Sequence, residues 1–201
     1  MRMVCAYLAC LGAFCVSPAA SAGTYAVDPV HSAALFTVEH MGVSLSHGRF
    51  NDINGEIVAD EEDSTNNAVN ITIRTESIDT ANADRDDRLR GADFMNTEEF
   101  PEMTFRSKRF EAVEGNRFLV TGDFTLLGTT EELNVEVLKT GEGEDREGNP
   151  LIGFTTTFTI KRSEFGMTTY LGPIGDDVKI TISVEAGLKK DVVARADPAG
   201  R

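Results

Sequence analysis

Residues 178–184 read Val-Lys-Ile-Thr-Ile-Ser-Val, with an apolar side chain at every second position. Successive side chains of a β-strand point to opposite faces, so this spacing predicts a strand with one buried and one solvent-facing side. The same alternation recurs at 69–73 and 133–137. Other apolar runs predict further strands at 24–30, 33–40, 48–59, 103–110, 117–127 and 153–162. Helical spacing is scarce, so an all-β protein is expected.

Turn-forming residues separate these runs, which favours pairing between successive strands. They lie at Asn54-Gly55, 114–116, Leu127-Gly128, 141–150 and Gly172-Pro173. Segment 83–95 departs from the alternation, because it is rich in Asp, Arg and Leu, and it predicts one short helical segment.

A sheet of eight or nine twisted strands is favoured to close, because closure removes the unpaired edges. We therefore predict an extended antiparallel up-and-down, lipocalin-like β-barrel. Strands of about 10 residues, rising ~3.3 Å per residue, would make it roughly 30 Å long. An eight-stranded barrel either fills with side chains or encloses one small ligand, and the sequence leaves both alternatives open.

The N-terminus has the features of a secretory signal peptide. Arg2 supplies a positive charge, residues 4–16 are apolar, and Ala20-Ser21-Ala22 forms a small-x-small cleavage site. The apolar run is 13 residues long, whereas a membrane span needs ~20, so no stable membrane insertion is expected. We expect a signal peptide at 1–22, a barrel domain at 23–188, a C-terminal tail at 189–201, and a periplasmic location.

Composition excludes several classes of function. The three cysteines, Cys5, Cys10 and Cys15, all fall within the signal peptide, so the mature chain would have neither disulfides nor thiolate ligands. The net charge is −14, and loss of Arg2 makes it −15. A charge of this sign repels nucleic acids and anionic membrane surfaces, so no nucleic-acid partner is expected.

Few residues point to catalysis or to a metal site. The three histidines, His31, His40 and His47, do not have the short spacing of metal ligands, so we expect no metal and no cofactor. No Gly-x-Ser-x-Gly nucleophile motif occurs, and an enzyme is not expected. Arg85, Arg88 and Arg90 could bind a phosphate or carboxylate head group, or could belong to a self-neutralising helix in solvent.

Several segments in order resemble the YceI-like family of exported proteins. They lie at 28–32, 36–41, 48–50, 77–80, 85–86, 89–90, 93–94, 100–101, 104–107, 120–128, 162–167 and 175–178, for example Asp-Pro-Val-His-Ser and Arg-Ser-Glu-Phe-Gly-Met. The resemblance spans roughly residues 25–186. It departs at Arg88, where the family often has His. The resemblance implies a lipocalin-like barrel that binds polyisoprenoid lipids, including prenylated quinone precursors, in the periplasm, with no established catalytic residues.

Apolar-face positions supply the predicted ligand-binding residues. They are Phe36, Val38, His40, Phe50, Phe94, Phe105, Phe124, Leu126, Phe158, Ile160, Phe165 and Met167. The partner expected is a polyisoprenoid or another long-chain lipid. Two alternatives stay open: an accessory protein that acts on a bound quinone or small haem, and a filled barrel that binds a partner at its rim. A homodimer is compatible with the sequence.

Cleavage is expected before Gly23, because the short apolar run ends at a small-x-small site. Intact-mass measurement of the exported protein checks this. A mass that includes residues 1–22, or a diacylglyceryl group on Cys15, would contradict it.

Overall fold

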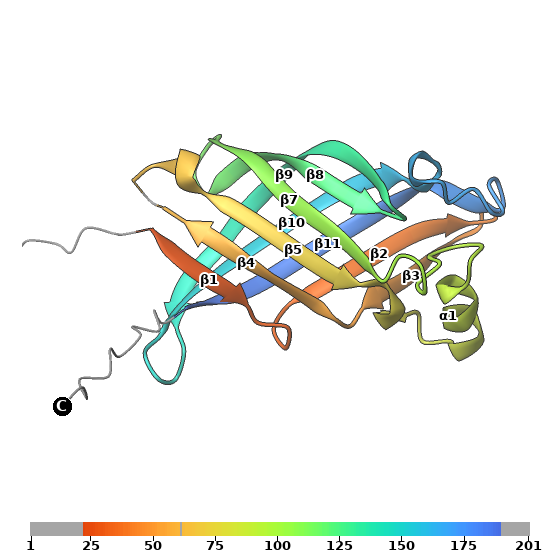
Figure 1. Ribbon diagram of the computed structural model, residues 1–201, viewed down its shortest axis with the longest axis horizontal. Helices are drawn as coiled ribbons and strands as arrows, with labels where there is room; N and C mark the ends of the chain where they lie inside the picture. The colour runs from red at the N-terminus through yellow and green to blue at the C-terminus, as the bar shows by residue number, and fades with distance from the viewer. Residues whose placement is uncertain (1–21, 61, 190–201) are drawn as a thin grey trace, which may run out of the picture.

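The computed structural model describes residues 22–60 and 62–189. The expected signal peptide and C-terminal tail lie outside these residues, except for Ala22 and Lys189. Eleven strands form one antiparallel sheet that closes on itself as an elongated barrel (Figure 1). They are β1 (Gly23–Val27), β2 (Ala33–His40), β3 (Ser44–Phe50), β4 (Ile53–Ala59), β5 (Ala68–Arg74), β6 (Ile78–Asp79), β7 (Glu102–Ala112), β8 (Arg117–Leu126), β9 (Thr129–Glu144), β10 (Pro150–Lys161) and β11 (Ile174–Leu188).

Three of the barrel strands are interrupted, and each interrupted strand is counted as two in this numbering. β1 and β2 both pair with one edge of β11, β1 at 186–188 and β2 mainly at 178–183. On their other edges, β1 pairs with β4 and β2 pairs with β3. In the next position of the sheet, β4 pairs with β5 and β3 pairs with β6. Counting each interrupted strand once leaves eight strands that pair in succession and close through β11. The predicted up-and-down barrel is thus confirmed.

The strands are longer than the sequence pattern predicted. β9 has 16 residues and β11 has 15, and at ~3.4 Å per residue β9 spans roughly 50 Å. The last five residues of β9, 140–144, are all exposed. Because both faces of that part of the strand meet water, it needs no alternation of apolar and polar side chains, and the pattern gave no sign of it.

Two predicted turns lie wholly or partly within strands. Asn54 and Gly55 pair with Thr72 and Ile71 inside β4. Glycine fits there because a Cβ atom would collide with the carbonyl oxygen of Asn70. The predicted turn at 141–150 shrinks to 145–149, because β9 and β10 continue into it. The Leu127-Gly128 turn is confirmed, with φ values of 51° and 73°.

Helix α1 (Ala83–Arg90) ends five residues before the predicted boundary at Met95. At its actual end, the N–H of Gly91 donates to the carbonyl of Arg88. The buried Asp86 accepts the backbone N–H of Thr80 at 2.8 Å. Arg85 donates to the hydroxyl and the carbonyl of Thr80, both at 2.7 Å, and Arg90 donates to two further carbonyls. These two arginines hold α1 against the end of β6. Within residues 22–60 and 62–189 no helix is long and apolar enough to cross a membrane.

The sheet has a gap beside α1. β6 pairs with β3, whereas β7 pairs with β5 and β8. Segment 80–101, which contains α1, leaves the sheet between β6 and β7 and lies at one end of the barrel (Figure 1). We call this the α1 end. The turn between β2 and β3 and the connection between β10 and β11 lie at the same end.

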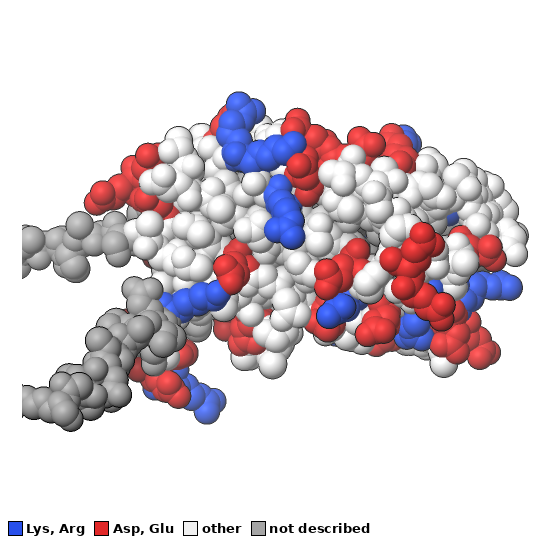
Figure 2. Space-filling model, viewed as in Figure 1, with Lys and Arg blue, Asp and Glu red and all other residues white. Residues whose placement is uncertain are grey.

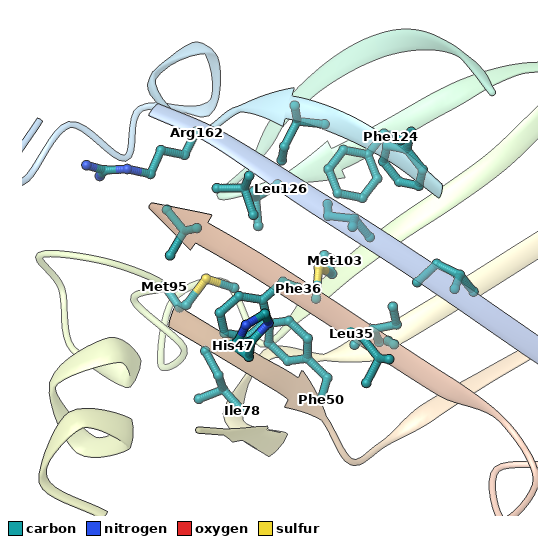
Figure 3. A pocket seen from close by; sticks show the side chains of 18 of the residues that line it. Leu35, Phe36, His47, Phe50, Ile78, Met95, Met103, Phe124, Leu126 and Arg162 are labelled. Atoms are coloured by element: carbon teal, nitrogen blue, oxygen red, sulfur yellow. The ribbon is translucent and has the colours of Figure 1, made fainter. Parts of the chain in front are cut away.

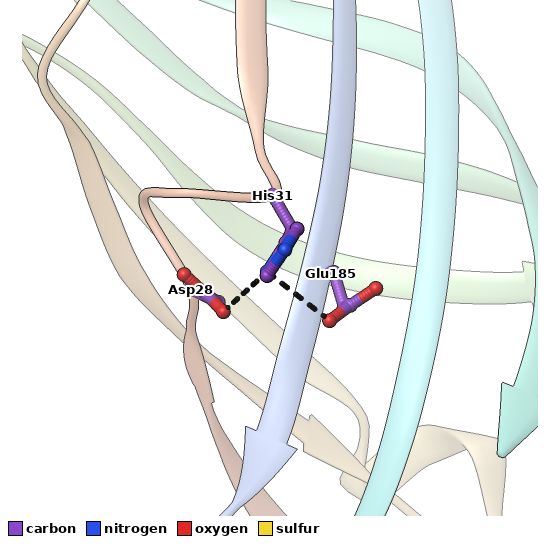
Figure 4. A group of neighbouring side chains, drawn as sticks. All are labelled: Asp28, His31 and Glu185. Carbon is purple, nitrogen blue, oxygen red and sulfur yellow. Dashed lines mark hydrogen bonds and ion pairs between the residues drawn. The ribbon is translucent and has the colours of Figure 1, made fainter. Parts of the chain in front are cut away.

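An ion-pair cluster closes the interruption between β1 and β2 (Figure 4). His31 Nδ1 lies 2.8 Å from Asp28 Oδ2 and 3.6 Å from Glu185 Oε1 of β11. The hydrogen bond to Asp28 raises the pKa of His31, and the same bond lowers the pKa of Asp28. The cluster therefore holds the segment between β1 and β2 against β11, and it does so most strongly when His31 is protonated and Asp28 is ionised.

This cluster predicts a pH dependence of thermal stability. Because the pKa of His31 is raised in the folded state, its contribution is fully present below the unfolded value of about 6.5 and is lost as pH rises through the folded value. The contribution of Asp28 is present above about 3.9 and is lost as pH falls through its lowered folded value. The difference in Tm between the unaltered protein and His31→Gln should shrink between pH 6 and pH 9. A difference independent of pH would contradict this role.

Candidate functional site

A cavity of about 910 Å³ lies inside the barrel (Figure 3). Its walls are mostly aliphatic and aromatic side chains from β2–β5 and β7–β11. An engineered cavity of ~150 Å³ with similar walls stays dry and binds benzene, and small-molecule pockets span ~300–1,000 Å³. The barrel is therefore hollow, which decides between the two alternatives that the sequence left open.

Eleven of the twelve predicted ligand-binding residues line this cavity. They are Phe36, Val38, His40, Phe50, Phe94, Phe105, Phe124, Leu126, Phe158, Ile160 and Met167. Phe165 does not line it. That residue is 1% exposed and packs edge-on behind Phe124, with ring centroids 5.4 Å apart. The alternation that justified the prediction ends at Lys161, where β10 gives way to the 3₁₀ turn Arg162–Phe165.

Aromatic pairs form part of the cavity wall. The rings of Phe124 and Phe158 meet edge to face with centroids 6.2 Å apart, and those of Phe36 and Phe50 lie 5.7 Å apart. The Phe36 ring lies across Gly48 on the neighbouring strand, where a Cβ atom would collide with it. Glycine at position 48 therefore leaves room for the Phe36 ring beside the neighbouring strand.

Many lining residues are aliphatic and were not among the predicted binding residues. They include Ile57, Val69, Ile71 and Ile73 of β4 and β5, and Val178, Ile180, Ile182 and Val184 of β11. The alternation at 69–73 and 178–184 had marked most of them as inward-facing, but the prediction gave preference to aromatic residues. Glu39 alternates with Val38 and His40 in sequence, which predicts an outward side chain, but it also lines the cavity. The register between β2 and β11 is irregular at this point.

Most of the charged and histidine side chains of the lining lie at the α1 end, the acidic Glu39 and Asp84 among them, whereas Thr155 and Thr156 line the cavity from the middle of β10. His40, Ser44 and His47 come from β2 and β3, and Arg85 and Arg88 come from α1. The side chain of Arg85 is already bound to Thr80, whereas that of Arg88 makes no hydrogen bond or ion pair among the described residues. The structure thus separates the roles of the three arginines: Arg85 and Arg90 position α1, and Arg88 is an exposed, unpaired cation at the cavity.

Arg162 is a buried cation that the sequence did not reveal. Its side chain, in a residue 2% exposed, donates to the carbonyls of Met167, Thr169, Ile174 and Gly175 at 2.8–3.1 Å. Burial lowers the pKa of Arg162, but a guanidinium group stays charged at neutral pH. Arg162 therefore ties the connection between β10 and β11 to the end of the barrel, beside the cavity (Figure 3).

The three histidines are not brought together. His40 and His47 line the cavity, whereas His31 belongs to the ion-pair cluster between β1 and β2. Among the described residues, three potential ligand atoms within 4.8 Å of one another occur at Asp28, His31 and Glu185, outside the cavity. The hydrogen bond and ion pair within that group account for its arrangement.

Residues 25–186 match the profile of the YceI-like domain. The chain is 38% identical over 185 residues to a UPF0312 protein of Shewanella sp. strain MR-7, covering 90% of this chain and 96% of that protein. It is also 38% identical over 173 residues to the protein YceI of Salmonella arizonae, covering 85% and 90%.

Solved structures share the fold. A YCEI protein of Campylobacter jejuni matches with a TM-score of 0.68 at 29% identity, covering 76% of this chain and 90% of that one. A polyisoprenoid binding domain from Saccharophagus degradans matches with a TM-score of 0.67 at 15% identity, covering 82% and 98%. The resemblance in the ordered sequence motifs is confirmed, and this chain belongs to the YceI-like domain family.

Proposed function

We propose that the barrel binds one long apolar lipid of the polyisoprenoid class and carries or buffers it in the periplasm, without catalysing a reaction. The observation that carries this proposal is the apolar cavity of about 910 Å³ inside an elongated barrel. The description of the Saccharophagus degradans domain as polyisoprenoid binding supports the ligand class, because that domain has the same fold. The expected signal peptide supports the location.

The energetics fit a carrier better than an irreversible trap. Transfer of each CH₂ group from water into an apolar site is worth ~0.8 kcal/mol, so a polyprenyl chain offers more than binding requires. A membrane offers nearly the same transfer free energy, and part of the gain is lost in ordering the chain. Exchange between barrel and membrane would therefore be close to balanced.

The lining also favours one orientation of the ligand. The polar lining at the α1 end would receive a head group, and the apolar walls of the remaining strands would enclose the tail. Arg88, whose side chain is exposed and unpaired among the described residues, would face a phosphate or another acidic head. The ring of a prenylated quinone in the same place would lie beside His40 and His47.

Charge placed within the cavity should abolish lipid retention, because an ionised carboxylate would keep its water or undergo a costly pKa shift. Leu126→Glu and Ile182→Glu both introduce this charge, and Ile182, being only partly buried, is the easier site to alter without unfolding the barrel. Thr159→Glu is the matched control, because Thr159 is exposed on the outer face opposite Lys179.

Mass spectrometry of organic extracts from the purified variants measures the retained lipid, and circular dichroism checks their folding. The control should retain as much lipid as the unaltered protein, and both cavity variants should retain almost none. Folded Ile182→Glu with full lipid content, or an unaltered protein that takes up no prenyl lipid from micelles, would contradict the proposed function.

Removal of the Arg88 charge should weaken the binding of a prenyl phosphate and leave that of a neutral prenyl alcohol of equal length unchanged. Exposed ion pairs contribute up to ~1 kcal/mol, so Arg88→Ala should raise the Kd for the phosphate by roughly fivefold. Arg146→Ala, in the turn between β9 and β10, makes the same change of charge far from α1. Equal effects of the two variants in titrations would refute the proposed orientation.

A further inference from the structure

Large apolar side chains are exposed around the α1 end of the barrel. Val43 is 86% exposed, Met41 64%, Leu45 61%, Tyr170 55% and Leu171 42%. They come from the turn between β2 and β3 with the start of β3, and from the connection between β10 and β11. We call these five residues the apolar rim. Together they include most of the large hydrophobic side chains exposed in the described part of the chain.

The two segments of the rim are neighbours in space. Met41 N–H donates to the carbonyl of Pro173 at 2.6 Å, and His40 pairs with Ile174. Neither 41–46 nor 165–174 contains an Asp, Glu, Lys or Arg residue, although 26% of the chain is charged. The tip of the barrel where β2 ends is accordingly largely white in Figure 2, whereas charged side chains cover the flanks. The five rim residues are thus uncharged, and the carboxylate of Glu39 lies beside Gly42 in the same turn.

Turn geometry does not explain these apolar residues. Met41 and Tyr170 have φ values of 55° and 54°, and Gly42 has 65°. Left-handed backbone at such turn positions favours Asn, Asp or Gly, and costs free energy for other side chains. Polar residues would therefore form these turns more easily and would also keep them in water. An apolar side chain at such a position indicates a use other than turn formation.

The rim is continuous with the cavity. Tyr170 belongs to both, because it is half-exposed and also lines the cavity, and its ring centroid lies 6.4 Å from that of Phe94. His40 and Ser44, next to Met41 and Leu45 in sequence, line the cavity as well. A lipid that enters or leaves at this end would pass directly over the rim.

We propose that the apolar rim docks onto the surface of a phospholipid bilayer, so that lipid passes between membrane and cavity without crossing water. This inference rests on the proposed function, because a long apolar ligand has its reservoir in a membrane. The net charge of −14 repels anionic lipids, and the rim carries no charge. Docking therefore depends on shallow insertion of apolar side chains and suits a zwitterionic surface.

The lack of tryptophan in the chain allows a direct test. Val43→Trp places a single indole on the rim, and Val113→Trp places one in the turn between β7 and β8 at the opposite end of the barrel. Both valines are exposed, 86% and 61%. With phosphatidylcholine vesicles, the indole emission of Val43→Trp should shift to shorter wavelength and its quenching by iodide should fall several-fold. The indole of Val113→Trp should show neither change, and added NaCl should not reverse the shift.

Three results would overturn the proposal. The first is an unchanged emission spectrum of Val43→Trp, and the second is an equal change in both variants. The third is an emission shift of Val43→Trp that depends on protein concentration in the absence of vesicles. This result would show that the rim binds a second copy of the chain.

Uptake of a prenyl lipid from detergent micelles is measured in parallel, because it does not require a bilayer. If Val43→Trp takes up the lipid but its indole does not respond to vesicles, membrane docking is refuted and the proposed function stands. If it takes up no lipid, the proposed function is refuted whatever the vesicles show. In a variant with Val43→Asp and Leu171→Asp, uptake from vesicles should slow several-fold while retention after loading from micelles stays unchanged. An unchanged vesicle rate would count against docking.

Discussion

β11 forms hydrogen bonds along both of its edges, with β10 on one side and with β1 and β2 on the other. This pairing joins the end of the sheet to its beginning, and apart from the gap between β6 and β7 it removes the open edges that an extended sheet would leave. Once the sheet is closed, every inward side chain faces the same interior. Because these side chains are mostly apolar and the strands are long, closure produces an elongated apolar cavity.

The two ends of the barrel differ in chemistry, and the difference begins in the backbone. Segment 80–101 leaves the sheet between β6 and β7, and α1 occupies the space at that end. Hydrogen bonds from Arg85 and Arg90 to carbonyls near β6 hold the helix, and those of Arg162 hold the connection before β11. As a result, most of the polar lining, an unpaired arginine and exposed apolar side chains lie around one end of a mainly apolar cavity.

The difference between the two ends would set the direction in which a bound lipid lies. A closed apolar cavity stabilises a hydrocarbon chain but offers no preference for its direction. Polar groups at one end supply that preference, because a buried head group without partners would cost free energy. An uncharged rim at the same end would lower the cost of approaching a membrane, whereas the acidic flanks would keep the barrel from lying along an anionic surface.

Alternation of apolar and polar residues, read from the sequence alone, determined the all-β class and the inward direction of the nine predicted cavity residues that lie in strands, and the turn residues between the runs indicated the up-and-down pairing. This was possible because the period of two is local, and each strand carries it independently of its neighbours. The departures occur where local signals are weak or have two interpretations. Asn54-Gly55 has the composition of a turn but lies in a strand, where the glycine leaves room for the carbonyl oxygen of Asn70. Phe165 lies in the 3₁₀ turn that follows β10, beyond the end of the alternation. Only the tertiary structure decided that the barrel is hollow, that Arg162 is buried, and that residues 41–46 lie beside 165–174. These features depend on register and closure between segments far apart in the chain, which no local pattern of residues encodes.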